Sequence, residues 1–311
     1  MSLISGLVCR SVLVCALLLG AAFTRASSIV LSVEGHPVPY PVFSLFKGPG
    51  QLVRLELMGS EIDQIQLYLD GTAHGYRDGT AWVLNAPAQP GLYTLQLNHS
   101  VTTERKRLNL FVGHSVQELT DGYLNGYRIG AAPQPNPRYP RRYATPEYLY
   151  EVTADNIDTR LSPHFTLGQF VCKQVSGYPK YVVLKPSLLV LLERLLAEVR
   201  SAGISIDTFG VISGYRTPYY NERIGNVPTS RHVYGDAFDF FVDADGDGLM
   251  DDLNRDGQRN RADVDWLFTL IEKHSRKPES ALLTGGIGRY YRATHHGGFI
   301  HVDTRGYRAR W

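Results

Sequence analysis

Residues 230–239 read Ser-Arg-His-Val-Tyr-Gly-Asp-Ala-Phe-Asp, and residues 299–303 read Phe-Ile-His-Val-Asp. Together they supply one carboxylate, Asp239, and two imidazoles, His232 and His301. This combination suits a catalytic zinc ion, because three protein ligands leave the fourth tetrahedral position open for water. The sequence therefore predicts an enzymatic metal site and not a closed structural one.

The spacing within both stretches predicts how these side chains meet. Gly235 allows the backbone to turn before residues 237–242, which read as a buried strand. Side chains alternate with a period of two in residues 299–303, so His301 and Asp303 share one face of a second strand. We expect the two strands to be neighbours.

The motif Ser-x-His-x-x-Gly-x-Ala-x-Asp, followed by a late His-x-Asp, resembles the zinc D-alanyl-D-alanine carboxypeptidases and peptidoglycan endopeptidases, whose fold is shared with the Hedgehog signalling domain. The resemblance covers about residues 161–306 and includes FTLGQF at 165–170 and SGYRT at 213–217. It implies a secreted zinc peptidase that cuts amide bonds next to D-amino acids in peptidoglycan stem peptides, as a carboxypeptidase or an endopeptidase. The alternative is a non-catalytic, Hedgehog-like zinc and calcium domain that binds a cell-wall peptide or a protein partner.

Further residues are candidates for catalytic roles. Arg216 follows a predicted strand, and its guanidinium suits a substrate carboxylate or the oxyanion of amide hydrolysis; a structural ion pair is the alternative. Many of the resembling enzymes carry an acidic general base three residues before the last zinc histidine, where this chain has Gly298. The remaining candidates for the base are His296, its neighbour His295, and Asp303, whose alternative role is to orient a zinc histidine.

A second metal signature follows the zinc motif. Residues 252–263 place oxygen-bearing side chains at the positions of an EF-hand calcium loop, with glycine at the sixth position. The expected calcium ligands are Asp252, Asn254, Asp256, Gln258, Asn260 and Asp263. A weaker second calcium site is expected upstream, at Asp243, Asp245, Asp247 and Asp251. Crowded carboxylates repel one another unless a cation binds, and a solvated acidic loop is the alternative.

The chain is long enough for two domains, with 311 residues of which 43% are hydrophobic. Residues 27–115 show short alternating runs between turn residues, which predicts an all-β sandwich of immunoglobulin-like type. Residues 116–160 are rich in Pro, Tyr and Arg and are expected to form a linker or strap without a helix or central strand. Residues 161–311 are expected to form an α+β zinc-peptidase domain, with helices on one side of an antiparallel sheet and a calcium-loop insertion at 243–263.

The amino-terminal sequence predicts export. Residues 1–26 read as a signal peptide, and their apolar stretch is shorter than the ~20 residues of a spanning helix. We therefore expect a periplasmic or secreted protein without a stable membrane anchor after cleavage. Cys172 is then the one cysteine of the mature chain, and its apolar neighbours predict a buried, unreactive thiol.

Composition narrows the choice of partners. The formal net charge is +2 and no strong basic run is present, so we expect no nucleic acid; the expected partners are peptidoglycan peptides. The sandwich is expected to be a spacer or to bind the wall or a protein partner. Its scattered histidines are expected at the surface and not in a site: His36, His74, His99 and His114.

Overall fold

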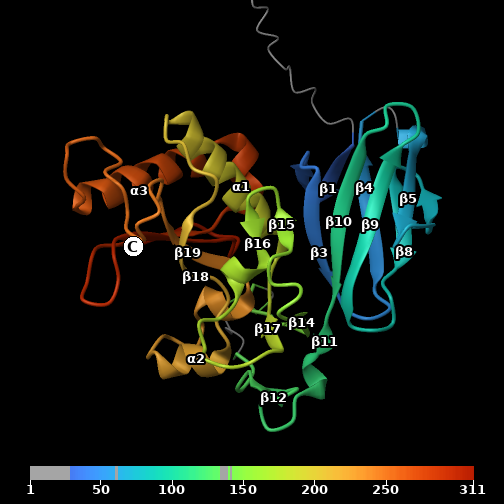
Figure 1. Ribbon diagram of the computed structural model, residues 1–311, viewed down its shortest axis with the longest axis horizontal. Helices are drawn as coiled ribbons and strands as arrows, with labels where there is room; N and C mark the ends of the chain where they lie inside the picture. The colour runs from blue at the N-terminus through green and yellow to red at the C-terminus, as the bar shows by residue number, and fades with distance from the viewer. Residues whose placement is uncertain (1–28, 60–61, 134–138, 141) are drawn as a thin grey trace, which may run out of the picture.

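The computed structural model describes residues 29–59, 62–133, 139–140 and 142–311. The predicted signal peptide, residues 1–26, lies outside these ranges, as do residues 134–138 of the predicted linker. Figure 1 shows a β-sandwich (blue to cyan), a connecting segment (green) and a C-terminal lobe (yellow to red). Among the helices in the described ranges, none has the length and apolar character needed to cross a membrane.

Ten strands in two five-stranded sheets build the sandwich. They are β1 (Val30–Val33), β2 (His36–Val38), β3 (Val42–Lys47), β4 (Leu52–Met58), β5 (Ile65–Leu69), β6 (Thr72–Ala73), β7 (Tyr76–Asp78), β8 (Ala81–Asn85), β9 (Gly91–His99) and β10 (Arg105–Val112). One sheet has the order β2-β1-β4-β8-β7 and the other β3-β10-β9-β5-β6, and only the β3–β10 pair is parallel. The predicted β-rich domain is thus present, and its immunoglobulin-like type stays a prediction.

The connecting segment is more ordered than its composition predicted. Its elements include β11 (His114–Ser115), the hairpin of β12 (Tyr123–Leu124) and β13 (Tyr127–Arg128), and β14 (Tyr148–Val152). β14 lies between β11 and β17 (Lys180–Val182) in a three-stranded sheet. The prediction that residues 116–160 contain no central strand is therefore wrong. Residues 148–152 contain no proline, so both edges of β14 keep the N–H groups that a central strand needs.

One sheet organises the C-terminal lobe. Its strands are β18 (Gly210–Ser213), β19 (Ala237–Phe241), β20 (Gly286–Tyr290), β21 (Phe299–Asp303) and β22 (Ala309–Arg310), in the order β18-β19-β21-β20-β22. The β20–β22 pair is parallel and the other pairs are antiparallel. Both strands predicted around the metal motif, residues 237–242 and 299–303, are present and adjacent.

Three α-helices accompany this sheet in the described residues: α1 (Pro186–Ser201), α2 (Pro218–Arg223) and α3 (Arg261–Ser275). α1 begins with Pro186 in its first turn, and Gly203, at φ +87°, follows its end. α3 packs against β20 and β21 as well as against α1. The apolar side chains of Ile300 and Val302 are buried on β21, as the period-two pattern requires.

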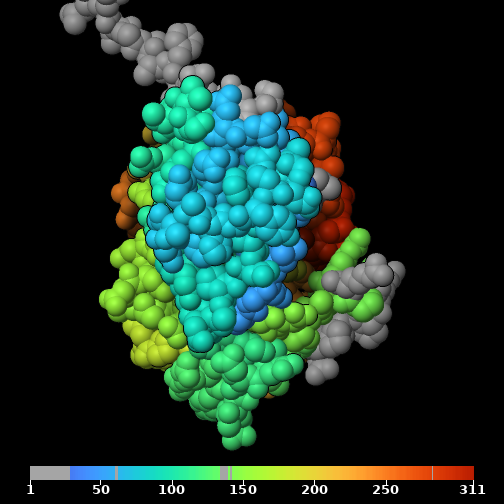
Figure 2. Space-filling view, turned by 90° about the vertical axis from the view of Figure 1, so that its right-hand side faces the viewer, coloured from blue at the N-terminus to red at the C-terminus, as the bar shows by residue number. Residues whose placement is uncertain are grey.

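The sandwich packs directly onto the C-terminal lobe. α1 contacts β2 and β3, and β15 (Arg160–Ser162) also lies against β3. The Asn109 side-chain amide donates a hydrogen bond to the Arg160 carbonyl across this contact, at 2.7 Å. Figure 2, seen from the sandwich side, shows the blue and cyan sandwich lying against the orange and red lobe. One continuous hydrophobic core therefore spans both parts of the chain.

Two sandwich histidines are buried, which corrects the prediction that all four lie at the surface. His36 is 2% exposed and His99 is 3% exposed. His36 opens β2, which α1 covers, and burial followed by the nearby Arg194 charge lowers its pKa. The Nδ1 atom of His99 accepts backbone hydrogen bonds from the loop that follows it. Cys172 is buried as predicted, and burial raises its pKa.

The turn before β19 depends on Gly235. It follows the short helix η4 (Arg231–Tyr234) and has a φ of 72°, a left-handed conformation that favours glycine. A Cβ atom at this position would lie 2.4 Å from the Val183 carbonyl oxygen. The Gly235 carbonyl in turn accepts a hydrogen bond from the Lys185 N–H at 2.9 Å. Only glycine fits this turn, which sets the position of η4 relative to β19.

We expect Gly235→Ala to lower the free energy of unfolding by about 3 kcal/mol, because conformational strain and a backbone clash add together. Gly225→Ala is the matched control: its φ is +71° and an added Cβ meets nothing within 4 Å. That control should lose only about 1 kcal/mol, the cost of a left-handed alanine. Chemical denaturation of both variants measures the difference, and equal losses would contradict the close-packing argument.

Candidate metal centre

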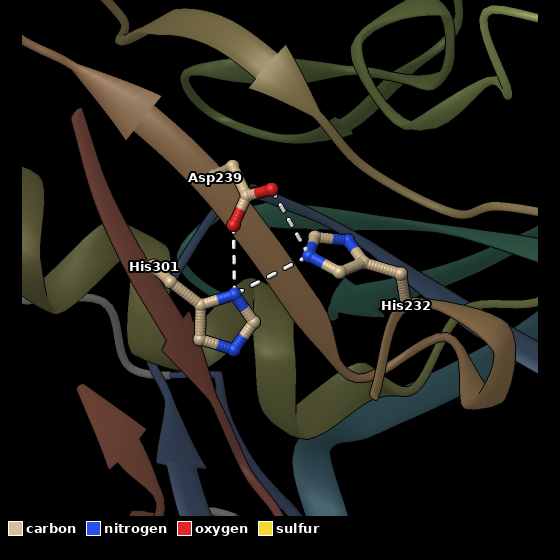
Figure 3. A group of neighbouring side chains, drawn as sticks. All are labelled: His232, Asp239 and His301. Carbon is tan, nitrogen blue, oxygen red and sulfur yellow. Dashed lines mark hydrogen bonds and ion pairs between the residues drawn. The ribbon is translucent and has the colours of Figure 1, made fainter. Parts of the chain in front are cut away.

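Three side chains predicted from the sequence converge in the C-terminal lobe, as Figure 3 shows. The His301 Nδ1 atom lies 2.7 Å from Asp239 Oδ1, and His232 Nε2 lies 3.1 Å from Asp239 Oδ2. The two imidazole nitrogens are 3.3 Å apart. All three residues are buried, with exposed fractions between 2% and 6%. Two imidazoles and a carboxylate thus point their ligand atoms at one shared position.

Strand register brings these residues together. Asp239 on β19 is directly opposite His301 on β21, so both side chains leave the same face of the sheet. His232 comes from η4, and its carbonyl accepts a hydrogen bond from the Arg216 N–H at 3.2 Å. Two strands and one turn therefore supply the three groups.

The outer nitrogen of each imidazole has its own acceptor. His232 Nδ1 lies 2.6 Å from the Gly214 carbonyl oxygen, and His301 Nε2 lies 3.1 Å from Asp303 Oδ2. Since a carbonyl or a carboxylate only accepts, each outer nitrogen carries hydrogen, which directs the lone pair of the neutral ring inward. Asp303 therefore lies where an orienting partner of His301 is needed.

The titration of this cluster follows from burial and charge. Burial lowers the pKa of His232, and the opposing attraction of Asp239 does not overcome it. Burial also disfavours charge on His301, but hydrogen bonds to Asp239 and Asp303 outweigh it and raise its pKa to about 9. Burial opposes ionisation of Asp239, yet the two imidazoles hold its pKa well below the usual range. The buried carboxylate is thus ionised and needs a cation beside it.

The donor set fits a zinc ion. Zinc–ligand bonds of about 2.0–2.1 Å in a tetrahedral arrangement place neighbouring ligand atoms about 3.3 Å apart. The three separations in this cluster are 2.7, 3.1 and 3.3 Å, so a small outward movement of the side chains is sufficient. His232, Asp239 and His301 would hold the ion, and Asp303 with the Gly214 carbonyl would orient the imidazoles.

Arg216 contacts the metal-ligand carboxylate directly. Its Nη2 donates to Asp239 Oδ2 at 2.6 Å, and its Nε donates to Ser213 Oγ at 2.7 Å. The guanidinium also lines the pocket above the cluster, and its side chain is 11% exposed. Arg216 therefore both forms an ion pair with Asp239 and lines the pocket above the metal-binding cluster.

The cluster opens into a pocket of about 660 Å³, the metal pocket. His296 lines it, whereas His295 is exposed and is not part of its lining. Asp303 is 1% exposed and lies behind His301, outside this lining; its carboxylate bonds to Arg305. The buried position favours the orienting role of Asp303 over the role of general base.

Position 298 faces away from the metal pocket. A Cβ atom on Gly298 would lie 2.5 Å from Val264 Cγ2 on α3. A carboxylate at this position would therefore clash with the helix and would not reach the pocket. This packing is consistent with a general base elsewhere in this chain.

The sequence analysis missed an aromatic wall of the metal pocket. Trp311 Nε1 donates to the Tyr290 hydroxyl at 2.7 Å, and its ring centroid lies 5.2 Å from that of His301. Gly288 makes room for this indole, because a Cβ there would meet the ring at 2.5 Å. Gly286 and Gly288 both lie on the face of the sheet that carries His301. This Gly-x-Gly pattern was the sequence signal for an aromatic ring packed on that face.

The two predicted calcium loops differ in how their carboxylates are used. In the loop at residues 252–263, the Asp263 carboxylate is buried and accepts hydrogen bonds from the Leu253 and Asn260 N–H groups, which caps α3. In the upstream loop, carboxylates gather close enough to share a cation: Asp243, Asp245 and Asp247. The Arg259 guanidinium contacts two of these carboxylates. Calcium at either loop stays a prediction.

One comparison with known proteins matches the segment that contains two of the three residues of the metal centre. Residues 163–256 match the family profile described as Peptidase M15. No curated protein matches the chain significantly. Among solved structures, fibronectin(III)-like modules of CbhA from Clostridium thermocellum match with 14% identity over 26% of this chain and 92% of that chain, at a TM-score of 0.19. The resemblance to the zinc D-alanyl-D-alanine carboxypeptidase superfamily is therefore confirmed over residues 163–256, the segment that carries Arg216, His232 and Asp239.

Proposed function

We propose that this protein is a zinc-dependent peptidase that hydrolyses amide bonds next to D-amino acids in peptidoglycan stem peptides. The observation that carries the proposal is the convergence of His232, Asp239 and His301 at the floor of a 660 Å³ pocket. The Peptidase M15 match supports a metallopeptidase and peptidoglycan peptides as the substrate class. The predicted signal peptide supports a periplasmic or secreted location, where this substrate is found.

The metal and the chain have separate tasks in this proposal. A bound zinc ion supplies Lewis-acid polarisation of a carbonyl and acidification of water. Arg216 is held by Ser213 and Asp239 beside the pocket, where its positive charge stabilises negative charge that develops on the substrate carbonyl oxygen. Asp303 fixes the ring of His301, which keeps the ligand geometry ready for reaction.

His296 is the proposed proton acceptor. It lines the metal pocket, its Nδ1 lies 2.7 Å from the Gly297 carbonyl oxygen, and its ring packs edge-on against Phe299. That carbonyl accepts the Nδ1 hydrogen, so Nε2 of the neutral ring keeps its lone pair for the proton of an attacking water. Gly298 leaves no carboxylate for this task at the position where many of the resembling enzymes have one.

A non-catalytic role is the second candidate, and one observation favours it. Among the described residues that line the metal pocket, Asp239 is the one carboxylate, and it is committed to the histidines and Arg216. A domain with this lining could hold a wall peptide without cleaving it, as a Hedgehog-like module. Turnover of a purified muropeptide by the zinc-loaded protein, lost on chelation, supports the peptidase and excludes this alternative.

We also propose that residues 252–263 bind calcium. Asp252, Asn254 and Asp256 present side-chain oxygens around the start of this loop. Asp252 and Asn254 accept backbone hydrogen bonds from Asp256 and Gly257, and Asp256 accepts one from Gln258. Calcium would add attraction between these oxygens and fix the entry to α3. The ion would then stabilise the helix that supports β21.

We expect His232→Ala to reduce bound zinc from one ion per chain to a trace, because two ligands hold zinc far more weakly than three. His296→Ala is the matched control: it should keep full zinc but lower turnover roughly 10²- to 10⁴-fold. Mass spectrometry measures the zinc occupancy, and near-UV circular dichroism shows whether each variant is folded. Full zinc in His232→Ala would overturn the ligand assignment, and wild-type turnover in His296→Ala would overturn the base.

Arg216→Lys should lower kcat by about 100-fold, because lysine keeps the charge but cannot bond Ser213 and Asp239 with one planar group. Zinc content should stay at the wild-type level, and the free energy of unfolding should change by less than ~1 kcal/mol. Ser213→Ala, which removes only the support for Nε, should give a smaller loss. An unchanged kcat in Arg216→Lys would assign Arg216 a structural role.

Calcium at a hundredfold excess over its dissociation constant should stabilise the zinc-loaded protein by about 2.7 kcal/mol and raise the melting temperature by several degrees. Asp252→Asn combined with Asp256→Asn should abolish this shift. Asp263 is unsuitable for the test, since its carboxylate caps α3 with or without calcium. Asp155→Asn, an exposed substitution outside the loop, is the control. A melting temperature independent of calcium would leave the segment a solvated acidic loop.

A further inference from the structure

A second pocket lies behind the wall of the metal pocket. It has a volume of about 540 Å³, and we call it the arginine pocket because three arginines line it: Arg259, Arg261 and Arg292. Its floor includes the buried side chains of Met250 and Val264. The pocket thus combines an apolar floor with a positively charged rim.

The same stretch of chain separates the two pockets. Tyr290 lines the metal pocket and Tyr291 lines the arginine pocket. Where the chain returns into β21, His296 and Phe299 line the metal pocket, whereas the two glycines between them line the arginine pocket. The two pockets are therefore separated only by the hairpin that joins β20 and β21. A peptide that extends out of the metal pocket across this hairpin would reach the arginine pocket next.

Most arginines at these two pockets are neutralised by aspartates. Arg216, Arg231, Arg305 and Arg259 pair with Asp239, Asp236, Asp303 and Asp245, respectively. In the part of the chain that the structure describes, no carboxylate pairs with Arg261 or Arg292. Their charges therefore remain available to a ligand, and both belong to the same pocket.

Arg261 is oriented before any ligand binds. Its guanidinium lies over the Tyr291 ring, 4.0 Å from the ring centroid. The Tyr291 hydroxyl is fixed by a 2.9 Å hydrogen bond to Asp265, which also pairs with Arg289. A guanidinium stacked on an aromatic face keeps its N–H edges free for a planar, charged acceptor. Carboxylates match this fork with two parallel hydrogen bonds.

We propose that the arginine pocket binds a carboxylate of the peptide substrate, as a second subsite next to the metal centre. The inference rests on the proposed function, because it takes the ligand to be a stem peptide that occupies both pockets. Arg261 and Arg292 bind the carboxylate, and Met250 and Val264 pack against the aliphatic carbons beside it. The subsite selects stems with a free acid over stems with an amide at that position.

The test compares two stem peptides that are identical except that internal carboxylates in one are replaced by carboxamides. Arg261→Gln combined with Arg292→Gln should weaken binding of the acidic stem about tenfold and raise its KM by the same factor, with kcat within twofold. Neither value should change for the amidated stem. Lys273→Gln combined with Arg107→Gln removes the same net charge at exposed positions outside both pockets and should leave both stems unaffected.

Equilibrium binding separates failure of the subsite from failure of the proposed function. Calorimetry on zinc-loaded wild type at low temperature, and on His232→Ala, measures affinity for each stem whether or not it is cleaved. Preference for the acidic stem that disappears in the double arginine variant supports the subsite, even if no stem is hydrolysed. Equal affinities of wild type and double variant for the acidic stem, or equal losses for both stems, would overturn it.

Discussion

The charge of Asp239 is the constraint on which the metal centre depends. This carboxylate leaves the middle of a buried strand and is 3% exposed, so it must be compensated within the protein. His232, His301 and Arg216 supply that compensation, each within hydrogen-bonding distance of one of its oxygens. Figure 3 shows the two imidazoles turned toward it from different elements. A divalent cation held by the same atoms satisfies the charge equally well, which is why the cluster suits zinc.

Further buried ion pairs hold the elements around this carboxylate. Arg231 forms a bidentate contact with the fully buried Asp236, which closes the turn between η4 and β19. Asp303 bonds to His301 and Arg305 and also accepts the Gly286 N–H at 2.9 Å, which ties β21 to β20. Such pairs add little net stability but allow few alternative arrangements. Their contribution here is to position the groups that bind the metal.

The hairpin between β20 and β21 shapes both pockets. Its residues divide between the two sides, with Tyr290, His296 and Phe299 at the metal pocket and Tyr291, Arg292, Gly297 and Gly298 at the arginine pocket. Gly298 has no side chain, and this allows the hairpin to pack directly against Val264. That packing leaves no room for a side chain at position 298. It also brings His296 to the metal pocket and Tyr291 to the arginine pocket.

Local pattern was sufficient for much of the metal centre. The type and order of His232, Asp239 and His301, and the two strands that carry two of them, are encoded in short motifs with a clear period. Tertiary structure decided the rest. Trp311 bonds to Tyr290, and Arg261 stacks on Tyr291, although the members of each pair are more than twenty residues apart and share no motif, so only packing brings them to a pocket. The same holds for β14, whose role as a central strand depends on partners on both sides, and for His36, which is buried because α1 covers it. Sequence determines which side chains can do chemistry, whereas long-range packing determines which of them lose their water and meet.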